Sequence, residues 1–505
     1  MKERILKNIL SHSAGRIFEM VLGVLLIPFL IWKLGAKGVG LIVLAESLIR
    51  FFDLVITGLR TGLGRYIGIS FAKGDKDEAN SFISTAKGIF FIVFACFIAA
   101  GGLLWYYFPR FFNVPGIFTQ QVGLFMFMMI LSAIAQTSFL SSFAVLYSRQ
   151  RFDLLNLYNA IRNTFRSLLC FGVYLFFPPK IYYYGFIYFI AIMAEQLLVY
   201  RGAGILFPER TISVKDFSFE KARKLFSFAG YRIMQSLSGL LYTDTDMVLI
   251  NKFMGPYFNA VYSISLKFVS VLERLIKKSL WVLAPSYTEL VGKREFSRLG
   301  GIYRSITKAS ALISLPICAI LFLFGKDLIV LWVGKKFIAS VNPMYINIMA
   351  GLPGLVFASA GGITTAFAKI RLPGIVAFLA AIGNVIISFY CAIVLGWGLV
   401  GFAFGTLCAA LAYDLIFEPY YACKLSGLRY FSFISESFGK PLLLCLVFGL
   451  LIYFLKFQVQ LPIIFVLTAI AICVPIYFYC AYMFIMDNNE KLKLKDLIPR
   501  GRKVL

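Results

Sequence analysis

Charged residues are scarce in this chain, and acidic residues are the scarcest. Only 15% of the 505 residues are charged, and 24 acidic residues stand against 50 lysines and arginines. A soluble protein usually has roughly 25% charged residues, whereas 60% of the residues here are hydrophobic. A soluble globular domain is therefore excluded.

Residues that build catalytic and metal centres are also rare. The chain has one histidine, His12, and its nine cysteines fall in or beside apolar runs without the spacing of metal ligands. It has no phosphate-binding loop and no motif that pairs a nucleophile with a base. We therefore expect no cofactor, no metal and no enzymatic activity. Nucleotide hydrolysis by the chain itself is excluded, which leaves coupling to an H⁺ or Na⁺ gradient open.

Long apolar runs are what the sequence has in abundance. Fourteen of them, each about 20 residues long, could cross a bilayer as helices, and the loops between them are short. They lie near residues 11–32, 39–59, 86–108, 117–146, 155–177, 182–201, 226–251, 258–283, 307–325, 344–368, 372–395, 397–422, 439–457 and 461–485. The chain is predicted to be an all-α polytopic membrane protein.

The basic residues of the loops indicate the orientation of the spans. Most of them lie in alternate loops, and the richest segments are 201–224 and 491–503. By the positive-inside rule both termini are cytoplasmic, in an inner or plasma membrane. The net charge of +26 is thus a topology signal, and nucleic acid is not an expected partner. Residues 64–84 and 212–228 are predicted to form amphipathic helices at the inner interface with membrane lipids.

A weak internal repeat divides the chain. Lys33-Leu-Gly35 ends the first span, and Lys252-Phe-Met-Gly255 ends the seventh in the same way. In both copies a helix ends, the chain turns on glycine, and a helix with central charges follows. Such repeats are typical of transporters with two pseudo-symmetric lobes. We expect lobes at 1–206 and 226–424, an amphipathic cytoplasmic linker at 207–225, and two further helices with a basic tail at 425–505.

Seven basic residues lie inside predicted spans. They are Arg16, Arg50, Arg162, Arg166, Arg232, Lys267 and Arg274. A basic residue at the centre of a spanning helix costs roughly 2.5–3.5 kcal/mol, so these side chains should face a polar interior. A cavity lined with cations favours an anion. On the eighth span Lys267 and Arg274 share a face, and the guanidinium of Arg274 could bind phosphate oxygens bidentately.

Pairing with acidic residues is the alternative interpretation of these bases. Arg16 could pair with Glu19 on the first span, and Arg162 with Glu195 on the sixth. Arg232 could extend to the inner surface.

The embedded acids are open to two interpretations in the same way. They are Glu19, Glu46, Asp53, Asp244 and Asp246, and they are candidates for ion coupling. Pairing between helices is the alternative. The stripe of Glu46, Arg50 and Asp53 on the second span favours a cavity lining.

Several loose motifs follow one another in a familiar order. They are Leu34 to Gly40; Asp53 with Gly58 and Arg65; Asp246 to Gly255 with Tyr262 and Ser263; Leu315-Pro316 through Trp332 to Phe337; and Asn384 with Leu395 to Gly401. Over nearly its whole length the chain resembles the polysaccharide flippases of the multidrug/oligosaccharidyl-lipid/polysaccharide exporter superfamily. This group contains the O-antigen flippases of lipopolysaccharide synthesis and, more distantly, the lipid II flippase.

The resemblance implies two six-helix lobes around a central cavity that opens alternately to each side. It implies that the substrate is a polyprenyl-pyrophosphate-linked oligosaccharide, moved from the cytoplasmic to the outer leaflet. Other membrane proteins of polysaccharide assembly are implied as partners. In that family arginines on helices one, two and eight contact the pyrophosphate. Arg16, Arg50, and Arg274 or Lys267 occupy comparable places here.

Two other functions stay open. A drug or cation antiporter of the same fold should carry uncompensated acids, whereas the embedded bases here outnumber the plausible partners in the fifth and eighth spans. A membrane-embedded glycan polymerase or ligase usually needs a large outer loop, and the predicted outer loops are short.

Overall fold

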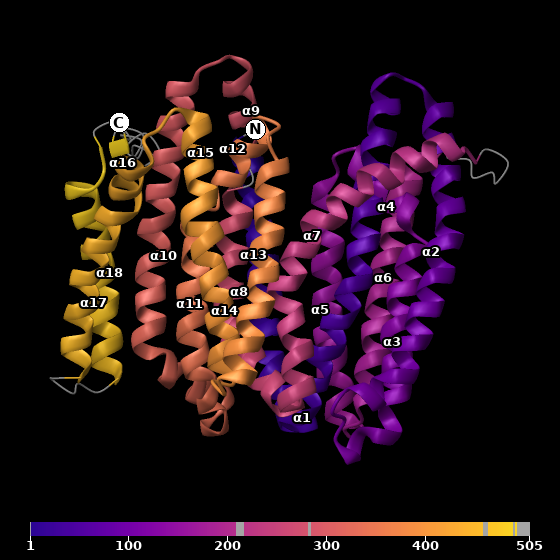
Figure 1. Cartoon of the computed structure of the whole chain (residues 1–505), viewed down its shortest axis with the longest axis horizontal. Helices are drawn as coiled ribbons and strands as arrows, with labels where there is room; N and C mark the ends of the chain where they lie inside the picture. Colours follow the sequence, from indigo (N-terminus) through magenta and orange to yellow (C-terminus); the bar gives the residue numbers. More distant parts are fainter. Residues whose placement is uncertain (1, 209–216, 281–283, 458–462, 488–489, 492–505) are drawn as a thin grey trace. The chain divides into compact units, whose positions relative to one another are not determined.

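The computed structural model describes residues 2–208, 217–280, 284–457, 463–487 and 490–491 (Figure 1). At some helical positions the side chain lies outside this description, and Arg16, Arg232 and Arg274 are among them. All regular elements in the described ranges are helices. The chain forms two compact units, Met1–Ser263 with Ala392–Leu399, and Ile264–Cys391 with Val400–Leu505.

The first unit is built around the long helix α1. Its helices are α1 (Lys2–Ala72), α2 (Lys76–Phe111), the short η1 (Gly116–Phe118), α3 (Thr119–Thr137), α4 (Leu140–Ser148), α5 (Phe152–Phe176), α6 (Ile181–Leu206), α7 (Phe219–Met254) and the start of α8 (Pro256–Leu280). α1 packs against α7, α4, α2 and α5, while α3 packs along α6. An apolar core that includes Ile67, Phe82 and Val145 joins α1, α2 and α4.

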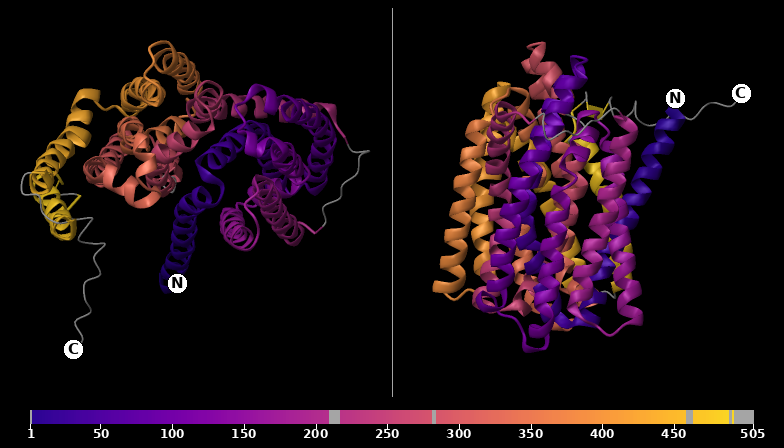
Figure 2. Two further views of the ribbon diagram at one scale, coloured as in Figure 1. Left: turned by 90° about the horizontal axis from the view of Figure 1, so that it is seen from below. Right: turned by 90° about the vertical axis from the view of Figure 1, so that its right-hand side faces the viewer.

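The second unit continues from α8. Its helices are α9 (Ala284–Gly292), α10 (Phe296–Val333), η4 (Lys335–Ser340), α11 (Val341–Val356), α12 (Ala360–Ala366), α13 (Arg371–Phe389), α14 (Leu399–Ala410), α15 (Glu418–Ser426), α16 (Tyr430–Ile434), α17 (Lys440–Phe457) and α18 (Ile463–Phe484). Three π-helical stretches, Tyr390–Val394, Leu411–Phe417 and Ser435–Gly439, extend α13, α14 and α16. α17 and α18 lie side by side, and α17 packs on α10 (Figures 1 and 2).

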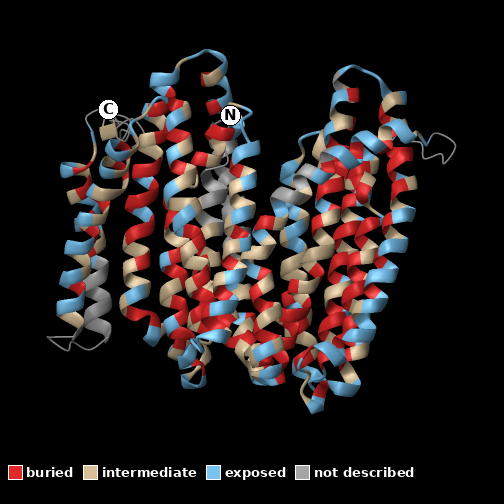
Figure 3. Ribbon diagram, in the orientation of Figure 1, coloured by how far each residue is buried: buried red, intermediate tan, exposed pale blue. Residues whose placement is uncertain are grey.

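The helices agree with a membrane-spanning fold. In the described residues seven helices are long and apolar enough to cross a bilayer, or eight if the bent pair Lys335–Val356 and Ala360–Ala366 is one span. The described residues of the predicted spans are mostly helical, with 11–32 and 39–59 both in α1 and 117–146 divided among η1, α3 and α4. Many residues along α2 and α17 are exposed (Figure 3), and they include the apolar Phe91, Leu103, Leu443 and Leu450. The all-α polytopic membrane fold is confirmed.

Three helices end at glycines with nearly the same backbone geometry. Gly35 divides α1 at φ 72° and ψ 168°, Gly255 ends α7 at φ 96° and ψ 171°, and Gly334 ends α10 at φ 92° and ψ 166°. This region of φ and ψ is essentially restricted to glycine. The glycine turn predicted for both copies of the repeat is therefore present, and a third turn of the same kind follows α10.

Two predicted interfacial helices are not separate elements. Residues 64–72 continue α1 without a break, and α2 begins at Lys76 with Asp75 as its N-cap. Residues 219–228 are the first turns of the 36-residue helix α7, with Ser218 as the N-cap, while residues 209–216 lie outside the described part. The amphipathic patterns belong to the ends of helices that extend beyond their apolar stretches. By packing, α7 belongs to the first unit.

Candidate functional site

Glu46 of α1 is a meeting point of polar side chains in the first unit. Arg166 of α5 donates a hydrogen bond of 3.0 Å from Nη1 to Glu46 Oε1, and the hydroxyl of Tyr184 on α6 donates one of 2.6 Å to the same oxygen. The guanidinium of Arg166 also lies 5.7 Å from the ring centre of Tyr188. Three helices are thus joined through one carboxylate at the depth of the predicted spans.

Arg50 lies one turn further along α1 and pairs with another helix. Its Nε donates a hydrogen bond of 2.6 Å to Asp244 Oδ1 on α7, its Nη2 also pairs with that oxygen, and Nη2 donates one of 2.8 Å to Ser47. The side chain of Asp244 is only 2% exposed, whereas that of Arg50 is 43% exposed. Arg50 is therefore anchored by a buried acid while its side chain stays partly exposed.

Arg162 of α5 and its neighbour Asn163 are also bound by acids. Arg162 Nη1 donates a 2.8 Å hydrogen bond to Glu195 Oε2 on α6, and Asn163 Nδ2 donates one of 2.7 Å to Glu19 Oε1. The pairing of Arg162 with Glu195, open from the sequence, is the arrangement in the structure. The side chains of Arg162 and Arg166 remain about one quarter exposed, at 26% and 25%.

Arg60 belongs to the same group and was missed by the sequence analysis. Its Nη2 donates to the backbone oxygen of Gln136 and to Gln196 Oε1, both at 3.3 Å, and its guanidinium lies 4.8 Å from the ring centre of Phe143. Gln136 Nε2 donates a 3.1 Å hydrogen bond to Asp53. The break between α3 and α4 leaves helix-end carbonyls, which a cation stabilises. Arg60 lies just beyond the second predicted span, so counting embedded charges could not find it.

We call this group the arginine–carboxylate cluster. Its members are Arg50, Arg60, Arg162 and Arg166 with Glu46, Asp53, Glu195 and Asp244, and Glu19 joins it through Asn163. The cluster therefore holds at least as many acids as arginines. The premise that embedded bases outnumber their partners in the fifth span is wrong, because the partners come from other helices. An anion could bind these arginines only by sharing them with carboxylates or by displacing the carboxylates.

The remaining predicted residues have other surroundings or lie outside the described part of the chain. Asp246 is buried in the first unit, where the Tyr262 hydroxyl donates a 3.3 Å hydrogen bond to it. Lys267 lies on α8 in the second unit, partly buried. The side chains of Arg16, Arg232 and Arg274 are outside the described part of the chain. In the described residues no group of three or more His, Cys, Asp or Glu side chains could hold a metal ion.

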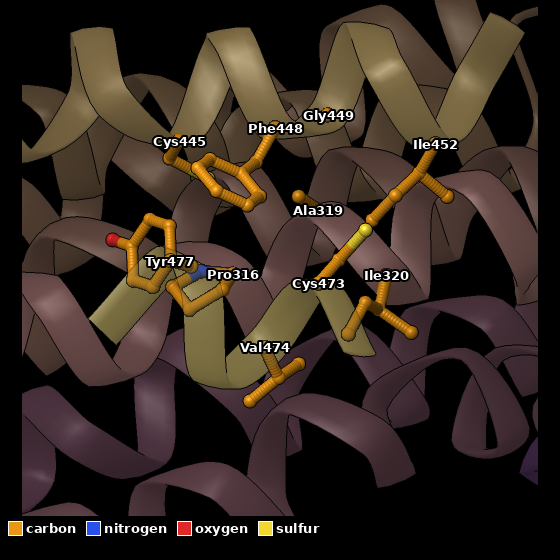
Figure 4. A pocket seen from close by; sticks show the side chains of 10 residues that line it. All are labelled: Pro316, Ala319, Ile320, Cys445, Phe448, Gly449, Ile452, Cys473, Val474 and Tyr477. Atoms are coloured by element: carbon orange, nitrogen blue, oxygen red, sulfur yellow. The ribbon is translucent and has the colours of Figure 1, made fainter. Parts of the chain in front are cut away.

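A small cavity in the second unit has a different character. It measures about 20 Å³ and lies between α10, α17 and α18, with Pro316, Cys445, Phe448 and Tyr477 among the side chains around it (Figure 4). Its lining is almost wholly apolar and has no charged residue. It cannot serve the anion that the arginines favour.

Comparisons with known proteins agree with this architecture. Residues 190–342 match the family model described as "Polysaccharide biosynthesis protein". The lipid II flippase MurJ in an inward closed conformation superposes with a TM-score of 0.69 at 14% identity, covering 94% of this chain and 98% of that one. A multidrug resistance MATE family transporter of the MOP superfamily in an inward-facing conformation gives a TM-score of 0.65 at 15% identity, covering 81% and 96%.

The chain thus shares the fold of these two transporters, and part of it matches a polysaccharide biosynthesis family. Among curated proteins it is 21% identical to the uncharacterized membrane protein EpsK of Bacillus subtilis, over 86% of each chain. It is 20% identical to the probable low-salt glycan biosynthesis flippase Agl15 of Haloferax volcanii, over 43% of this chain and 46% of that protein. The resemblance inferred from the sequence motifs is confirmed. The superfamily includes exporters of unlike substrates, so the fold alone does not assign the cargo.

Proposed function

We propose that the protein is a transporter that flips a polyprenyl-pyrophosphate-linked oligosaccharide from the cytoplasmic to the outer leaflet by alternating access. The likeness to MurJ and Agl15 supports the flippase class. The observation that carries the proposal is the cluster of arginines at membrane depth, with Arg50, Arg162 and Arg166 all partly exposed. Such residues are costly in a bilayer and are usually retained for function.

The chemistry of these side chains suits a pyrophosphate. Each guanidinium offers a planar fork of N–H donors that matches phosphate oxygens and stays charged at any physiological pH. Arg50 uses Nε and Nη2 on Asp244 and Ser47 but remains 43% exposed. It can therefore contact a headgroup while Asp244 fixes its position. Arg16, Arg232, Lys267 and Arg274 are proposed as further headgroup contacts.

The proposed flippase class also suggests a location, neighbouring proteins and an energy source. We place the protein in the cytoplasmic membrane with both termini inside, as the loop charges favour. Other membrane proteins of polysaccharide assembly are its expected neighbours. Coupling to an H⁺ or Na⁺ gradient would use the embedded acids Glu19, Glu46, Asp53, Asp244 and Asp246.

The test in cells is loss and restoration of glycan export. Removing the gene from its host should leave lipid-linked oligosaccharide accumulated in the inner leaflet, and the wild-type gene should restore export. Arg50→Ala and Arg166→Ala should fail to restore it at normal protein level. Arg151→Ala is the matched control, because Arg151 pairs with Asp153 at the exposed start of α5. Normal export in both cluster variants would refute the proposal.

A drug or cation antiporter is the second candidate, and one observation favours it. The cluster holds at least as many acids as arginines, and Asp244 is buried. Loss of the gene should then sensitise cells to cationic drugs without changing the distribution of lipid-linked glycan. The two proposals therefore predict opposite results in the same strain.

A further inference from the structure

One acid of the cluster, Glu46, is bound by Arg166 and lies near Arg50. Glu46 accepts a hydrogen bond from Arg166 and lies one helical turn before Arg50, close enough to interact with it electrostatically. A pyrophosphate that bridges Arg50 and Arg166 would therefore compete for the position of the Glu46 carboxylate. Two anions cannot both occupy the same guanidinium face at this depth without strong repulsion.

The groups around Glu46 determine whether its carboxylate stays ionised once it is displaced from the arginines. The titratable and charged groups that interact with it include Arg50 on α1, Arg166 and Cys170 on α5, and Tyr184 and Tyr188 on α6. The two arginines are the cations among these groups, and Arg50 is also bound to Asp244 of α7. A carboxylate displaced from them would be an anion among phenol and thiol groups beside a second anion. Such a group is neutralised by a proton.

We propose that Glu46 is an internal counter-ion that the pyrophosphate of the substrate displaces, and that the displaced carboxylate takes up one proton. This inference rests on the proposed function. The proton comes from water on the side to which the site is open and binds to a carboxylate oxygen of Glu46. The Tyr184 hydroxyl keeps donating its hydrogen bond to the other oxygen. Headgroup binding is then coupled to proton uptake within one site.

Proton uptake on binding makes the headgroup affinity depend on pH in one direction. If binding takes up a proton, the affinity for the headgroup rises as pH falls, by up to about tenfold per pH unit while Glu46 is ionised in the free protein and protonated in the complex. A purely structural Glu46, which stays on Arg166 in both states, gives no such dependence.

The direct test is calorimetry of headgroup binding to the purified full-length protein. The probe is a diphosphate diester with one methyl group on each phosphorus, whose acidic groups stay ionised across the pH range used. Titrations in two buffers of different ionisation enthalpy report the protons taken up per probe bound. We expect about one for the wild-type protein. Binding without proton uptake would overturn the inference and leave the proposed function intact, whereas no binding at all would overturn both.

A substitution separates the counter-ion role from a structural one. Glu46→Gln keeps the size of the side chain and an acceptor for Tyr184 but removes the charge. We expect it to bind the probe about tenfold more tightly and to take up no proton, because the competing anion is gone. Weaker binding would mean that Glu46 mainly positions Arg166, and would contradict the inference. Asp153→Asn, which alters the exposed pair with Arg151, should leave affinity and proton uptake unchanged.

Discussion

Arg50 on α1 and Asp244 on α7 form an ion pair although 194 residues separate them in the sequence. The pair joins the two helices that contact each other most extensively in the first unit. Because Asp244 is buried, moving the arginine away would leave a buried carboxylate without its counter-ion. The pair thus links helix packing to the placement of a proposed ligand-binding side chain.

This pairing predicts strong coupling between the two positions. Asp244→Ala and Arg50→Ala should each lower the melting temperature in detergent, since a hydrogen bond to a charged group contributes about 1.5–3 kcal/mol. The double variant should lose clearly less than the sum of the two single losses. Thermal unfolding of the four proteins completes the cycle. Additive losses would show that the pair does not contribute to the folded state.

Replacing the glycines of the turns by alanine should strain the backbone without causing a steric clash. Gly35 and Gly255 have no neighbouring atom within 4 Å of an added Cβ, but both have positive φ. Gly35→Ala and Gly255→Ala should therefore destabilise the protein by about 1–3 kcal/mol through backbone strain. Gly172→Ala is the control, because Gly172 is helical and its added Cβ is equally free of contacts. It should be neutral or slightly stabilising. Equal melting temperatures for all three variants would refute the role of the turns.

A buried lysine in the second unit predicts that replacing the lysine and replacing its acidic partners differ in their effect on stability. Lys308 of α10 is 4% exposed and donates to Asp487 and Glu490, which follow α18, at 3.0 and 3.1 Å. Lys308→Met should be tolerated better than the combined change of Asp487→Asn and Glu490→Gln. The first leaves one accessible acid, Asp487 at 69% exposed, and one partly buried acid, Glu490 at 15%, whereas the second leaves a buried ammonium without a counter-ion. Melting temperatures in detergent measure the difference. The reverse order would contradict this account of the site.

The sequence predicted the helices well because their signals are local. Runs of apolar residues identified the spans, and the Lys-to-Gly patterns before Gly35 and Gly255 identified two of the helix breaks. The amphipathic segments were misplaced as separate helices, because local patterning does not show whether a helix continues past the membrane surface. Residues 64–72 and 219–228 simply extend α1 and α7.

Ion pairing was harder to predict because it depends on which helices are neighbours. Arg162 and Glu195 lie on consecutive helices and could be matched, but Arg166 meets Glu46 across 120 residues and Arg50 meets Asp244 across 194. No periodicity in the sequence relates these positions. Among the described residues Arg50, Arg162 and Arg166 have acidic partners, and only the packing of the helices brings these partners to them.

The most direct test of the central claim is transbilayer movement of a lipid-linked glycan by the purified protein. Vesicles containing the protein and a fluorescent polyprenyl-diphosphate-linked oligosaccharide are treated with dithionite, which bleaches only the accessible leaflet. With wild-type protein, or with the Arg151→Ala control, bleaching should proceed to the inner-leaflet lipid as well. With Arg50→Ala or Arg166→Ala it should stop at the outer leaflet, as in protein-free vesicles. Wild-type vesicles that bleach no further than protein-free ones, or cluster variants that bleach as fully as the wild type, would contradict the account.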